Sequence, residues 1–370
     1  VKEITRNDPE SEAPIMMITA NNGFIEQSER YAFNNAGESL KKYILLKKGE
    51  LAYNHGASKL RPYGSCFALT TAENARIPFV YHCFSAENQN AEFMSIELNG
   101  AEIENQLRKI VSSGARMDGL LNISCDEYTS VSVLLPGIEE QDCIADFFRQ
   151  LDNLITLHQR KYNKLLNVKK SMLEKMFPKN GSNIPEIRFK GFTDPWEQRK
   201  LGDVVQITMG QSPDGSTYSD EPSDYILVQG NADLQNGWVC PRIWTTQITK
   251  KADAGDLIMS VRAPAGAMGK TAYNAVIGRG VAAIKGNEFI YQLLVKMNAD
   301  GFWKTLSCGS TFESLNSDNI KNAEVKIPTT AEQIKIGDYF QQFDNLITLH
   351  QRELEKLQNI KKSMLEKMFV

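Results

Sequence analysis

The sequence DNLITLHQR fills residues 152–160 and recurs without change at residues 344–352. A second identical pair, KKSMLEKMF, lies at residues 169–177 and 361–369, and both pairs are separated by 192 residues. One gap-free register joins them over 42 positions starting at Pro136, and 28 of these positions are identical. Because the segments ahead of the two copies look almost unrelated, the sequence predicts two different regions, each followed by the same element.

The repeated element has the pattern of one long helix per copy. Glu140 and Glu332 lie near its start, and Lys175 and Lys367 near its end, which is the distribution that a helix dipole favours. No proline interrupts either copy before its last phenylalanine. At a rise of 1.5 Å per residue, about 38 residues would form a rod of roughly 57 Å.

Apolar residues and one histidine recur along each predicted helix at spacings of three and four residues. The two stripes are Leu151, Ile155, His158, Tyr162, Leu165, Val168, Met172 and Met176, and Phe343, Ile347, His350, Leu354, Leu357, Ile360, Met364 and Met368. This pattern is typical of coiled coils, so we expect the copies to bury their stripes on each other in antiparallel directions. His158 and His350 then meet at a pseudo-two-fold axis. The alternative is that each imidazole points to water.

The regions ahead of the helices have a mixed α/β pattern. Short strands are predicted within residues 43–54, 65–71, 78–84, 225–230, 256–261 and 281–286. A helix-like stretch, at about 101–112 and 287–304, then precedes a turn and a strand that ends at Pro136 or Pro328. We therefore expect an α/β (α+β) protein in which two globular heads are separated by two long antiparallel coiled-coil helices and related by an internal pseudo-two-fold repeat.

These patterns divide the chain into four segments. They are residues 1–135, the first head; 136–179, the first long helix; 180–327, a linker and the second head; and 328–370, the second long helix. VVQIT at 204–208 resembles VKEIT at 1–5, so the counterpart of PWEQRKLGD (195–203) would precede Val1. We therefore expect the first head to be shortened at its N-terminus.

Composition excludes several classes of protein. A net charge of −3 argues against a simple basic protein that coats DNA. Six cysteines form no Cys-x-x-Cys pair, and four histidines have no metal-ligand spacing with them, so we expect no metal site. The sequence shows no apolar run long enough for a membrane and no secretory leader, which favours a cytoplasmic protein.

The order of variable region, repeated helix, variable region and repeated helix resembles the specificity (S) subunit of type I restriction–modification enzymes. The resemblance covers the whole chain. Its local strings are PWEQRKLGDV (195–204), MGQSPDGSTY (209–218), DLIMSVRAP (256–264), SSGARMDGLLNI (112–123) and the start of the first helix at 140–155.

The resemblance implies a DNA-recognition subunit. Each head would be a target-recognition domain that reads one half of a bipartite, asymmetric site on double-stranded DNA. The helices would set the spacing and dock two modification (methyltransferase) subunits, and restriction (motor/nuclease) subunits would join these. It also implies no catalytic residue and no cofactor in this chain, with S-adenosylmethionine and ATP/Mg on the partner subunits.

Candidate DNA contacts are polar side chains in loops of the two heads. They are His55, Lys59, Arg61, Ser113 and Arg116 in the first head, and Gln211, Ser212, Tyr218, Arg262, Arg279, Ser310 and Thr311 in the second. Arginine and lysine suit guanine edges and phosphates, whereas serine, threonine and glutamine suit phosphates or adenine. For each of them, the alternative is a surface or fold-supporting role.

Enzyme signatures are weak. We find no glycine-rich methyltransferase turn and no Walker loop. Asp318, Glu324 and Lys326 echo a metal-dependent nuclease, but Ser132 and Leu134 stand at the repeat positions of the last two, so we interpret them as an exposed strand face. Two other classes stay open: an independent two-headed DNA-binding regulator, and a coiled-coil scaffold that binds only proteins.

Overall fold

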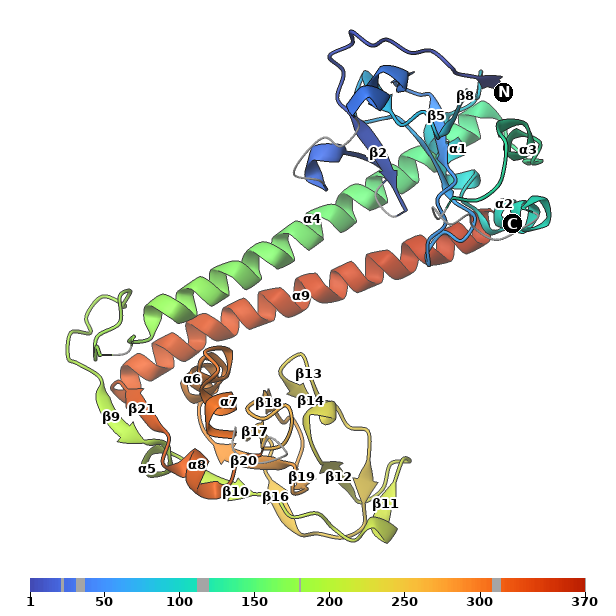
Figure 1. Ribbon diagram of the computed structural model, residues 1–370. Helices are drawn as coiled ribbons and strands as arrows, with labels where there is room; N and C mark the ends of the chain where they lie inside the picture. Colours follow the sequence, from blue (N-terminus) through green and yellow to red (C-terminus); the bar gives the residue numbers. More distant parts are fainter. Residues whose placement is uncertain (21–22, 31–36, 112–119, 180, 308–313, 370) are drawn as a thin grey trace. The chain divides into compact units, whose positions relative to one another are not determined.

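A computed structural model describes residues 1–20, 23–30, 37–111, 120–179, 181–307 and 314–369. It divides into two compact units (Figure 1): unit 1 comprises Val1–Leu157 and Glu355–Val370, and unit 2 comprises His158–Leu354. Each unit therefore contains one head together with part of both long helices. No helix among the described residues combines the length and the apolarity that a membrane crossing needs.

Unit 1 is built on a four-stranded antiparallel sheet in the order β1-β8-β5-β6. Its strands are β1 (Lys2–Glu3), β5 (Leu51–Asn54), β6 (Ser65–Ala68) and β8 (His82–Ser85). Two further antiparallel pairs are β2 (Met16–Thr19) with β3 (Gly23–Glu26) and β4 (Ile44–Lys47) with β7 (Asn74–Ile77). The helices of this head are α1 (Ala91–Glu97), α2 (Ala101–Ile110) and α3 (Cys125–Thr129), with short 3-10 turns at Gln27–Glu29 and Gly37–Lys42.

The run at 43–54 forms two strands, β4 and β5, that belong to different sheets. Gly49 has a φ of +82° between them, a left-handed conformation that glycine adopts without strain. The amide of Gly49 donates to the Leu69 carbonyl at 2.8 Å, and the amide of Lys48 donates to the Glu73 carbonyl at 2.9 Å. A turn at this glycine therefore separates two strands where the sequence pattern shows one apolar run.

Unit 2 contains a larger set of sheets. A six-stranded sheet has the order β10-β20-β17-β18-β14-β13, a five-stranded sheet the order β11-β15-β12-β19-β16, and β21 pairs with β9. The strands are β9 (Glu197–Lys200), β10 (Gln206–Met209), β11 (Tyr218–Ser219), β12 (Tyr225–Val228), β13 (Leu234–Gln235), β14 (Trp238–Val239), β15 (Trp244–Thr245), β16 (Lys250–Ala252), β17 (Leu257–Ser260), β18 (Met268–Lys270), β19 (Ala275–Ile277), β20 (Val281–Lys285) and β21 (Glu324–Ile327). The helices are α5 (Leu201–Val204), α6 (Glu288–Ala299), α7 (Phe302–Ser307) and α8 (Ser317–Lys321), with 3-10 turns at Gly215–Thr217 and Asn231–Asp233.

The two heads share a core despite their different sequences. The order β10-β20-β17-β18 in unit 2 repeats the order β1-β8-β5-β6 of unit 1. Asn90 caps α1 and Asn287 caps α6 by accepting a hydrogen bond from the third helical amide, as asparagine commonly does. Each of these asparagines also bonds a glutamine of a long helix, Gln141 in unit 1 and Gln333 in unit 2, which are 192 residues apart.

The long helices are α4 (Ile138–Met176) and α9 (Thr330–Met368), each 39 residues long. They run antiparallel, because in unit 2 Lys169 near the end of α4 bonds Asp344 near the start of α9 at 2.5 Å. In unit 1 the same bond joins Lys361 to Asp152, also at 2.5 Å. The 192-residue offset converts one ion pair into the other, as a pseudo-two-fold requires. The expected fold of two α/β heads with antiparallel coiled-coil helices is thus confirmed.

The predicted stripes face inward on both helices. Every described stripe position is buried or half-buried except Met368, of which 41% is exposed. The Nδ1 atoms of His158 and His350 lie 3.2 Å apart, within unit 2, with the rings edge to face. The two halves of the repeat therefore meet at the histidines that the sequence placed at its centre.

The strand that we predicted before Pro136 is wrong. Residues 131–136 form no strand, whereas β21 ends at Ile327, directly before Pro328. The reason lies in pairing: all four residues of β21 pair with β9. Among the described residues of unit 1, none forms a strand equivalent to β9, so residues 131–135 lack the partner that would make them a strand.

Candidate functional site

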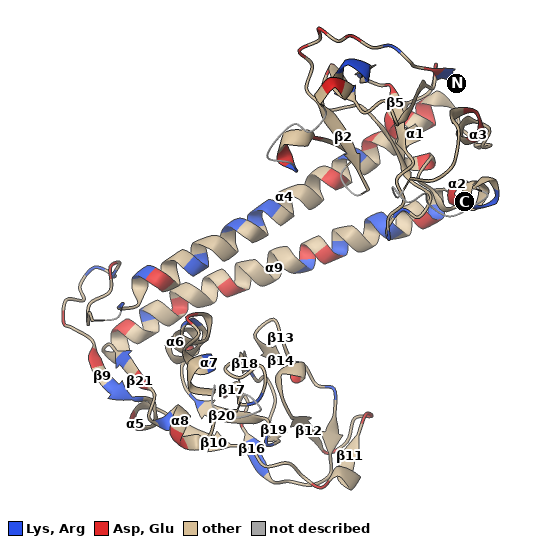
Figure 2. Cartoon of the chain, viewed as in Figure 1, with Lys and Arg blue, Asp and Glu red and all other residues tan. Residues whose placement is uncertain are grey.

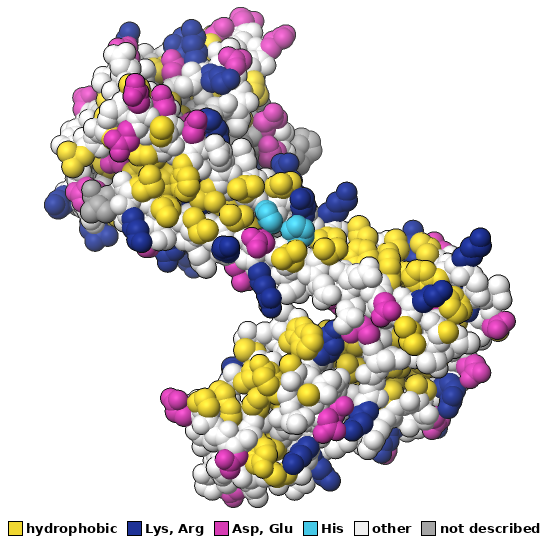
Figure 3. Space-filling view, turned by 180° about the vertical axis from the view of Figure 1, so that it is seen from behind, with side chains coloured by type: hydrophobic (Ala, Val, Ile, Leu, Met, Phe, Trp, Pro, Cys, Tyr) yellow, Lys and Arg dark blue, Asp and Glu magenta, His cyan; other side chains and the backbone are white. Residues whose placement is uncertain are grey.

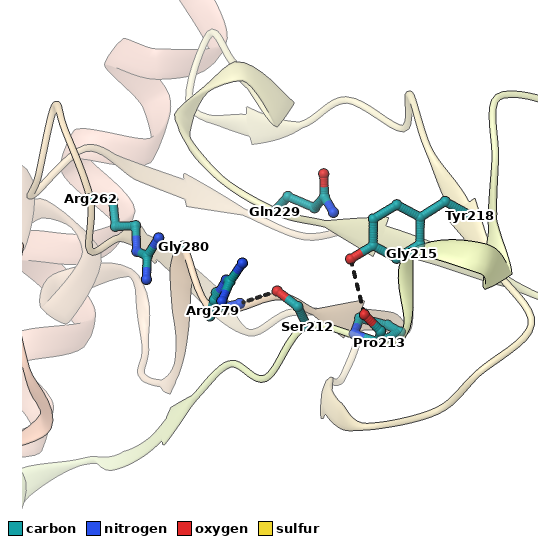
Figure 4. A pocket seen from close by; sticks show the side chains of 8 residues that line it. All are labelled: Ser212, Pro213, Gly215, Tyr218, Gln229, Arg262, Arg279 and Gly280. Carbon is teal, nitrogen blue, oxygen red and sulfur yellow. Dashed lines mark hydrogen bonds between the residues drawn. The ribbon is translucent and has the colours of Figure 1, made fainter.

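A pocket of about 420 Å³ opens on the surface of unit 2. It is lined by Ser212, Pro213, Gly215, Tyr218, Gln229, Arg262, Arg279 and Gly280 (Figure 4). Four of these, Ser212, Tyr218, Arg262 and Arg279, are residues that the sequence predicted as DNA contacts. They come from three segments far apart in the chain, and the structure brings them together.

Two hydrogen bonds join the loop after β10 to the turn between β19 and β20. The amide of Gln211 donates to the Ile277 carbonyl at 2.8 Å, and the hydroxyl of Ser212 accepts the amide of Arg279 at 3.2 Å. Ser212 thereby holds the turn that presents Arg279, as Figure 4 shows. Gln211 itself is exposed, and it does not line the pocket.

Two glycines allow this close approach of backbones. A Cβ atom on Gly280 would lie 2.0 Å from the Gln229 carbonyl oxygen, and one on Gly210 would lie 2.1 Å from the Gly278 carbonyl oxygen. Both oxygens are backbone atoms that directly follow a strand, Gln229 after β12 and Gly278 after β19, so neither can move aside as the end of a flexible side chain could. Glycine is therefore required at both positions for steric reasons.

Sequence reasoning missed Gln229, which lies in the pocket at the end of β12. Its position is set by Asp233, whose buried carboxylate accepts the amides of Gln229 at 2.7 Å and Gly230 at 3.2 Å. Arg242 pairs with the same carboxylate at 3.2 Å. A polar residue directly after an apolar strand was the available signal, because strand ends commonly carry binding residues.

The pocket is cationic on one side. Arg262 and Arg279 are exposed, and neither guanidinium forms an ion pair with a described residue. In Figure 4 both arginines lie on one side and Tyr218 on the other, with the Tyr218 hydroxyl donating to the Pro213 carbonyl at 3.3 Å. Nearby, hydrogen bonds from Ser216 lower the pKa of Asp214, which keeps that carboxylate ionised at the rim. Two free guanidinium groups beside an amide suit phosphate oxygens and the acceptor edges of bases.

The predicted contacts of unit 1 do not gather in this way. His55 is buried, and its two ring nitrogens lie 2.9 Å from the carbonyls of Leu121 and Val80, so the expectation that it contacts DNA does not fit its position. Arg61 is half-buried and donates to the Asn99 carbonyl at 2.7 Å, and desolvation lowers the pKa of its guanidinium. Lys59 is exposed. The first two therefore have fold-supporting contacts.

Four predicted contacts lie outside the described residues. They are Ser113, Arg116, Ser310 and Thr311. Their DNA-contacting role stays a prediction.

The nuclease-like residues have structural partners. Glu324 accepts a hydrogen bond from Gln198 on the paired strand at 2.8 Å, and Lys326 donates to the Lys179 carbonyl at 3.2 Å and to the Ser182 carbonyl. Asp318 lies in the first turn of α8, where an acidic residue is favoured. These contacts agree with our interpretation of the echo as part of a strand face.

The long helices carry charge of both signs. Figure 2 shows lysine and arginine interspersed with acidic side chains along α4 and α9. Between the helices, desolvation lowers the pKa of His350; the positive neighbours His158 and Lys161 add to this, and Glu353 opposes it. At neutral pH, His350 is therefore uncharged in its contact with His158.

Comparisons with known proteins agree with the repeat pattern. The family model described as "Type I restriction modification DNA specificity domain" matches residues 193–359, which include the pocket. The putative type I restriction enzyme MjaX specificity subunit of Methanocaldococcus jannaschii is 28% identical over 257 residues, which make up 66% of this chain and 60% of that protein. The MjaVIII specificity subunit of the same organism is 22% identical over 286 residues, 69% of this chain and 65% of its own length. The chain thus spans about three fifths of the first of these relatives.

Solved structures share the fold. A chain from a study of complex assembly and conformational transition of the type I R-M system superposes with a TM-score of 0.54 at 22% identity, covering 99% of this chain and 94% of that one. The S subunit of a type I restriction–modification system from M. genitalium superposes with a TM-score of 0.56 at 14% identity, covering 98% and 90%. At these identities the likeness concerns the fold.

Proposed function

We propose that this chain is a type I restriction–modification specificity subunit, the DNA-recognition subunit of such a complex. The specificity-domain match over residues 193–359 and the similarity to the MjaX specificity subunit support this. Each head reads one half of a split site on double-stranded DNA. Since the two heads differ in sequence while their helices repeat, the two half-sites differ as well, and the whole site is asymmetric.

The pocket of unit 2 is the observation that carries this proposal. It lies inside the matched specificity domain and places two exposed guanidinium groups, a glutamine amide and a tyrosine around one opening. Arginine reads guanine through its O6 and N7 acceptors, and glutamine reads adenine through N6 and N7. The pocket thus offers both phosphate positioning and base recognition in one place.

The long helices serve two purposes in this proposal. They set the separation of the half-sites, because a helix of fixed length holds its ends at a fixed distance. They also dock two modification (methyltransferase) subunits in equivalent ways, since equivalent residues on α4 and α9 make equivalent contacts. Restriction subunits with motor and nuclease activity join that assembly.

The chemistry belongs to the partners. We propose that this chain is not itself an enzyme, that the modification subunits bind S-adenosylmethionine, and that the restriction subunits use ATP and Mg²⁺. A net charge of −3 supports this division, because phosphate neutralisation then depends on positive charge from the assembled complex. A cytoplasmic location, where cellular DNA is accessible, goes with this proposal.

The first test maps methylated adenines in DNA exposed to the complex assembled from this chain and its modification subunits. We expect methylation at one asymmetric split sequence. Arg262→Ala and Arg279→Ala should each weaken binding to that sequence by about 1–3 kcal/mol, with relaxed specificity if a base contact is lost and a uniform loss if a phosphate contact is lost. Lys190→Ala, an exposed cation outside the pocket, is the matched control.

Other outcomes would point elsewhere. Tight, salt-sensitive binding to a split site without any modification subunit would favour an independent regulator. Absence of sequence-specific binding in every assembly would favour a protein scaffold. Removing one helical turn from both α4 and α9 should shorten the unread gap, and an unchanged gap would refute the spacer role.

A further inference from the structure

A chain of polar side chains crosses unit 2 from its six-stranded sheet to both long helices. Lys270 of β18 forms an ion pair with Glu288 of α6 at 2.9 Å. The side-chain amide of Gln292, one turn further along α6, donates to Glu288 at 2.8 Å and to Asp344 of α9 at 2.7 Å. Asp344 also accepts a hydrogen bond from Lys169 of α4 at 2.5 Å. We call these five side chains the polar network.

The polar network is largely shielded from water. Gln292 is fully buried, and each of the four charged side chains is between 13% and 28% exposed. The Lys270 ammonium group lies 4.6 Å from the ring centroid of Tyr291 and 5.0 Å from that of Trp238. On the surface, by contrast, charges of both signs are dispersed among apolar side chains, as the space-filling view shows (Figure 3). In a covered position, a hydrogen bond to a charged group is strong, and losing one partner leaves the other unpaired.

Gln292 is suited to join two carboxylates. Its side-chain amide nitrogen has two hydrogens, so it can donate to Glu288 and Asp344 at once. A glutamate at this position would add a third negative charge beside these two, and a leucine would remove the donor from both. Along the polar network the charges run positive, negative, neutral, negative and positive, so they balance.

Gly337 allows α9 to lie close to α6 beside the polar network. A Cβ atom at Gly337 would lie 3.1 Å from the Cβ atom of Glu288 and 3.1 Å from the backbone nitrogen of Phe289. Both distances are shorter than ordinary van der Waals contact. The first copy of the long helix has Ala145 at the equivalent position. The second copy thus carries the smaller residue at the point where it meets α6.

Unit 1 repeats only the helix part of the polar network. Asp152 is the equivalent of Asp344 and has an equivalent lysine partner. When α1 and α6 are aligned by their asparagine caps, however, α1 has an alanine and a serine in the places of Glu288 and Gln292. The serine, Ser95, bonds backbone groups of its own head. Accordingly, 49% of the Asp152 side chain is exposed, compared with 28% of that of Asp344.

We propose that the polar network fixes the orientation of the second head on the long helices, with Gln292 as its central positioning residue. The proposal rests on the proposed function, in which the helices set the separation of two half-sites. One base pair more in the gap shifts a half-site by about 3.4 Å and turns it by about 35°. A head that is bonded to both helices meets its half-site at one separation and angle, whereas a loosely held head tolerates several. The polar network therefore sharpens the discrimination between gaps of different length.

The first test measures DNA methylation by the complex assembled from the full chain and its modification subunits. The substrates carry a gap of the natural length or a gap one base pair shorter or longer. Gln292→Leu should lower the preference for the natural gap about tenfold, since a misplacement of about 1 Å can reduce a rate by even more. Base preferences within each half-site should stay the same, which a misfolded head would not allow.

Matched substitutions locate the effect. Gln342→Leu, the same change at an exposed position of α9, should leave the gap preference unchanged. Asp344→Ala should lower it as Gln292→Leu does, whereas Asp152→Ala at the equivalent position should not. Because Gln292 and Asp344 share one hydrogen bond, combining their two substitutions should add little to either one alone.

A second measurement needs no DNA. Spin labels at Ser223 in the head and Asp338 on α9, both exposed, report the distance between this head and the helix by electron paramagnetic resonance. Labels attached to introduced keto amino acids leave the six native cysteines untouched. Gln292→Leu should broaden the distribution of distances, and Gln342→Leu should not.

The outcomes separate this inference from the proposed function. An unchanged gap preference or an unchanged distance distribution in Gln292→Leu would overturn the inference. A complex without any preferred gap before substitution would refute the spacer role of the helices instead. The distance distribution would then still decide whether the polar network holds the head.

Discussion

Units 1 and 2 contain equivalent parts of the two long helices, yet equivalent residues have different environments. Glu332 is buried against Arg188, whereas Glu140 is exposed; Met176 is buried, whereas Met368 is not. The helix residues are alike, so the difference comes from the segment that packs on them. Burial is thus a property of the neighbours that a side chain meets, more than of the side chain itself.

The largest effect should come from removing the Trp196 ring, which is buried in the core of unit 2. Trp196→Ala should lower the free energy of unfolding of unit 2 by about 3–5 kcal/mol, because it leaves a cavity beside Phe177 and Phe289. Trp196→Phe should cost less, since the indole N–H has no hydrogen-bond partner among the described residues. Hydrogen exchange can separate the units, and equal losses in both would contradict the comparison.

The same substitution at two repeat-equivalent positions should have unequal effects. Glu332→Gln removes the charged partner of Arg188 and should cost about 2–3 kcal/mol. Glu140→Gln changes an exposed side chain and should stay within about 0.5 kcal/mol. Chemical denaturation of both variants measures the difference. Similar costs would mean that the two carboxylates have similar environments in solution.

The two ion pairs between the long helices, Lys169–Asp344 and Lys361–Asp152, test a feature that the two units share. Lys169→Ala and Lys361→Ala should each cost about 0.3–1 kcal/mol, as partly exposed ion pairs do. The loss should be the larger for Lys169, since 14% of its side chain is exposed, compared with 34% for Lys361. Double-mutant cycles with Asp344 and Asp152 check both couplings. A coupling in only one pair would break the pseudo-two-fold.

The smallest effect concerns acidity at the centre of the repeat. Desolvation lowers the pKa of His350 below its ordinary value of 6.5, so the unfolded chain takes up this proton at higher pH than the folded chain does. The contribution to stability is therefore complete above about pH 6.5 and falls as the pH drops through the folded pKa. Melting temperatures between pH 7.5 and 5 should show a component that His350→Gln removes. If the variant had the same pH profile as the unchanged protein, His350 would not be the source of this pH dependence.

Much of the architecture was predictable because it rests on repetition. Identical strings at one offset predicted equivalent helices, and spacings of three and four predicted the inward stripes. Strand pairing was less accessible, since β21 is a strand only where β9 pairs with it. The equivalent residues of unit 1 have a similar pattern without a partner, and the strand predicted there was wrong.

The site was predictable in part. Arginine, serine and tyrosine in glycine-rich loops indicated Ser212, Tyr218, Arg262 and Arg279, which the pocket unites. Gln229 was missed because its role depends on the close approach of Gly280, a contact between segments far apart in the chain. His55 is of a residue type that often contacts DNA, but it is buried and its ring nitrogens lie beside the carbonyls of Leu121 and Val80.

The sequence by itself determined the symmetry of this protein. Two copies of one helix, paired antiparallel, must meet at their midpoint and repeat the contacts that they make with each other. The contact of His158 with His350 and the equivalent ion pairs Lys169–Asp344 and Lys361–Asp152 follow from that rule. Only the tertiary structure decided which copies of a residue are buried and which loops share a pocket. The physical reason is that burial and convergence depend on segments distant in sequence, whereas helix periodicity depends on near neighbours.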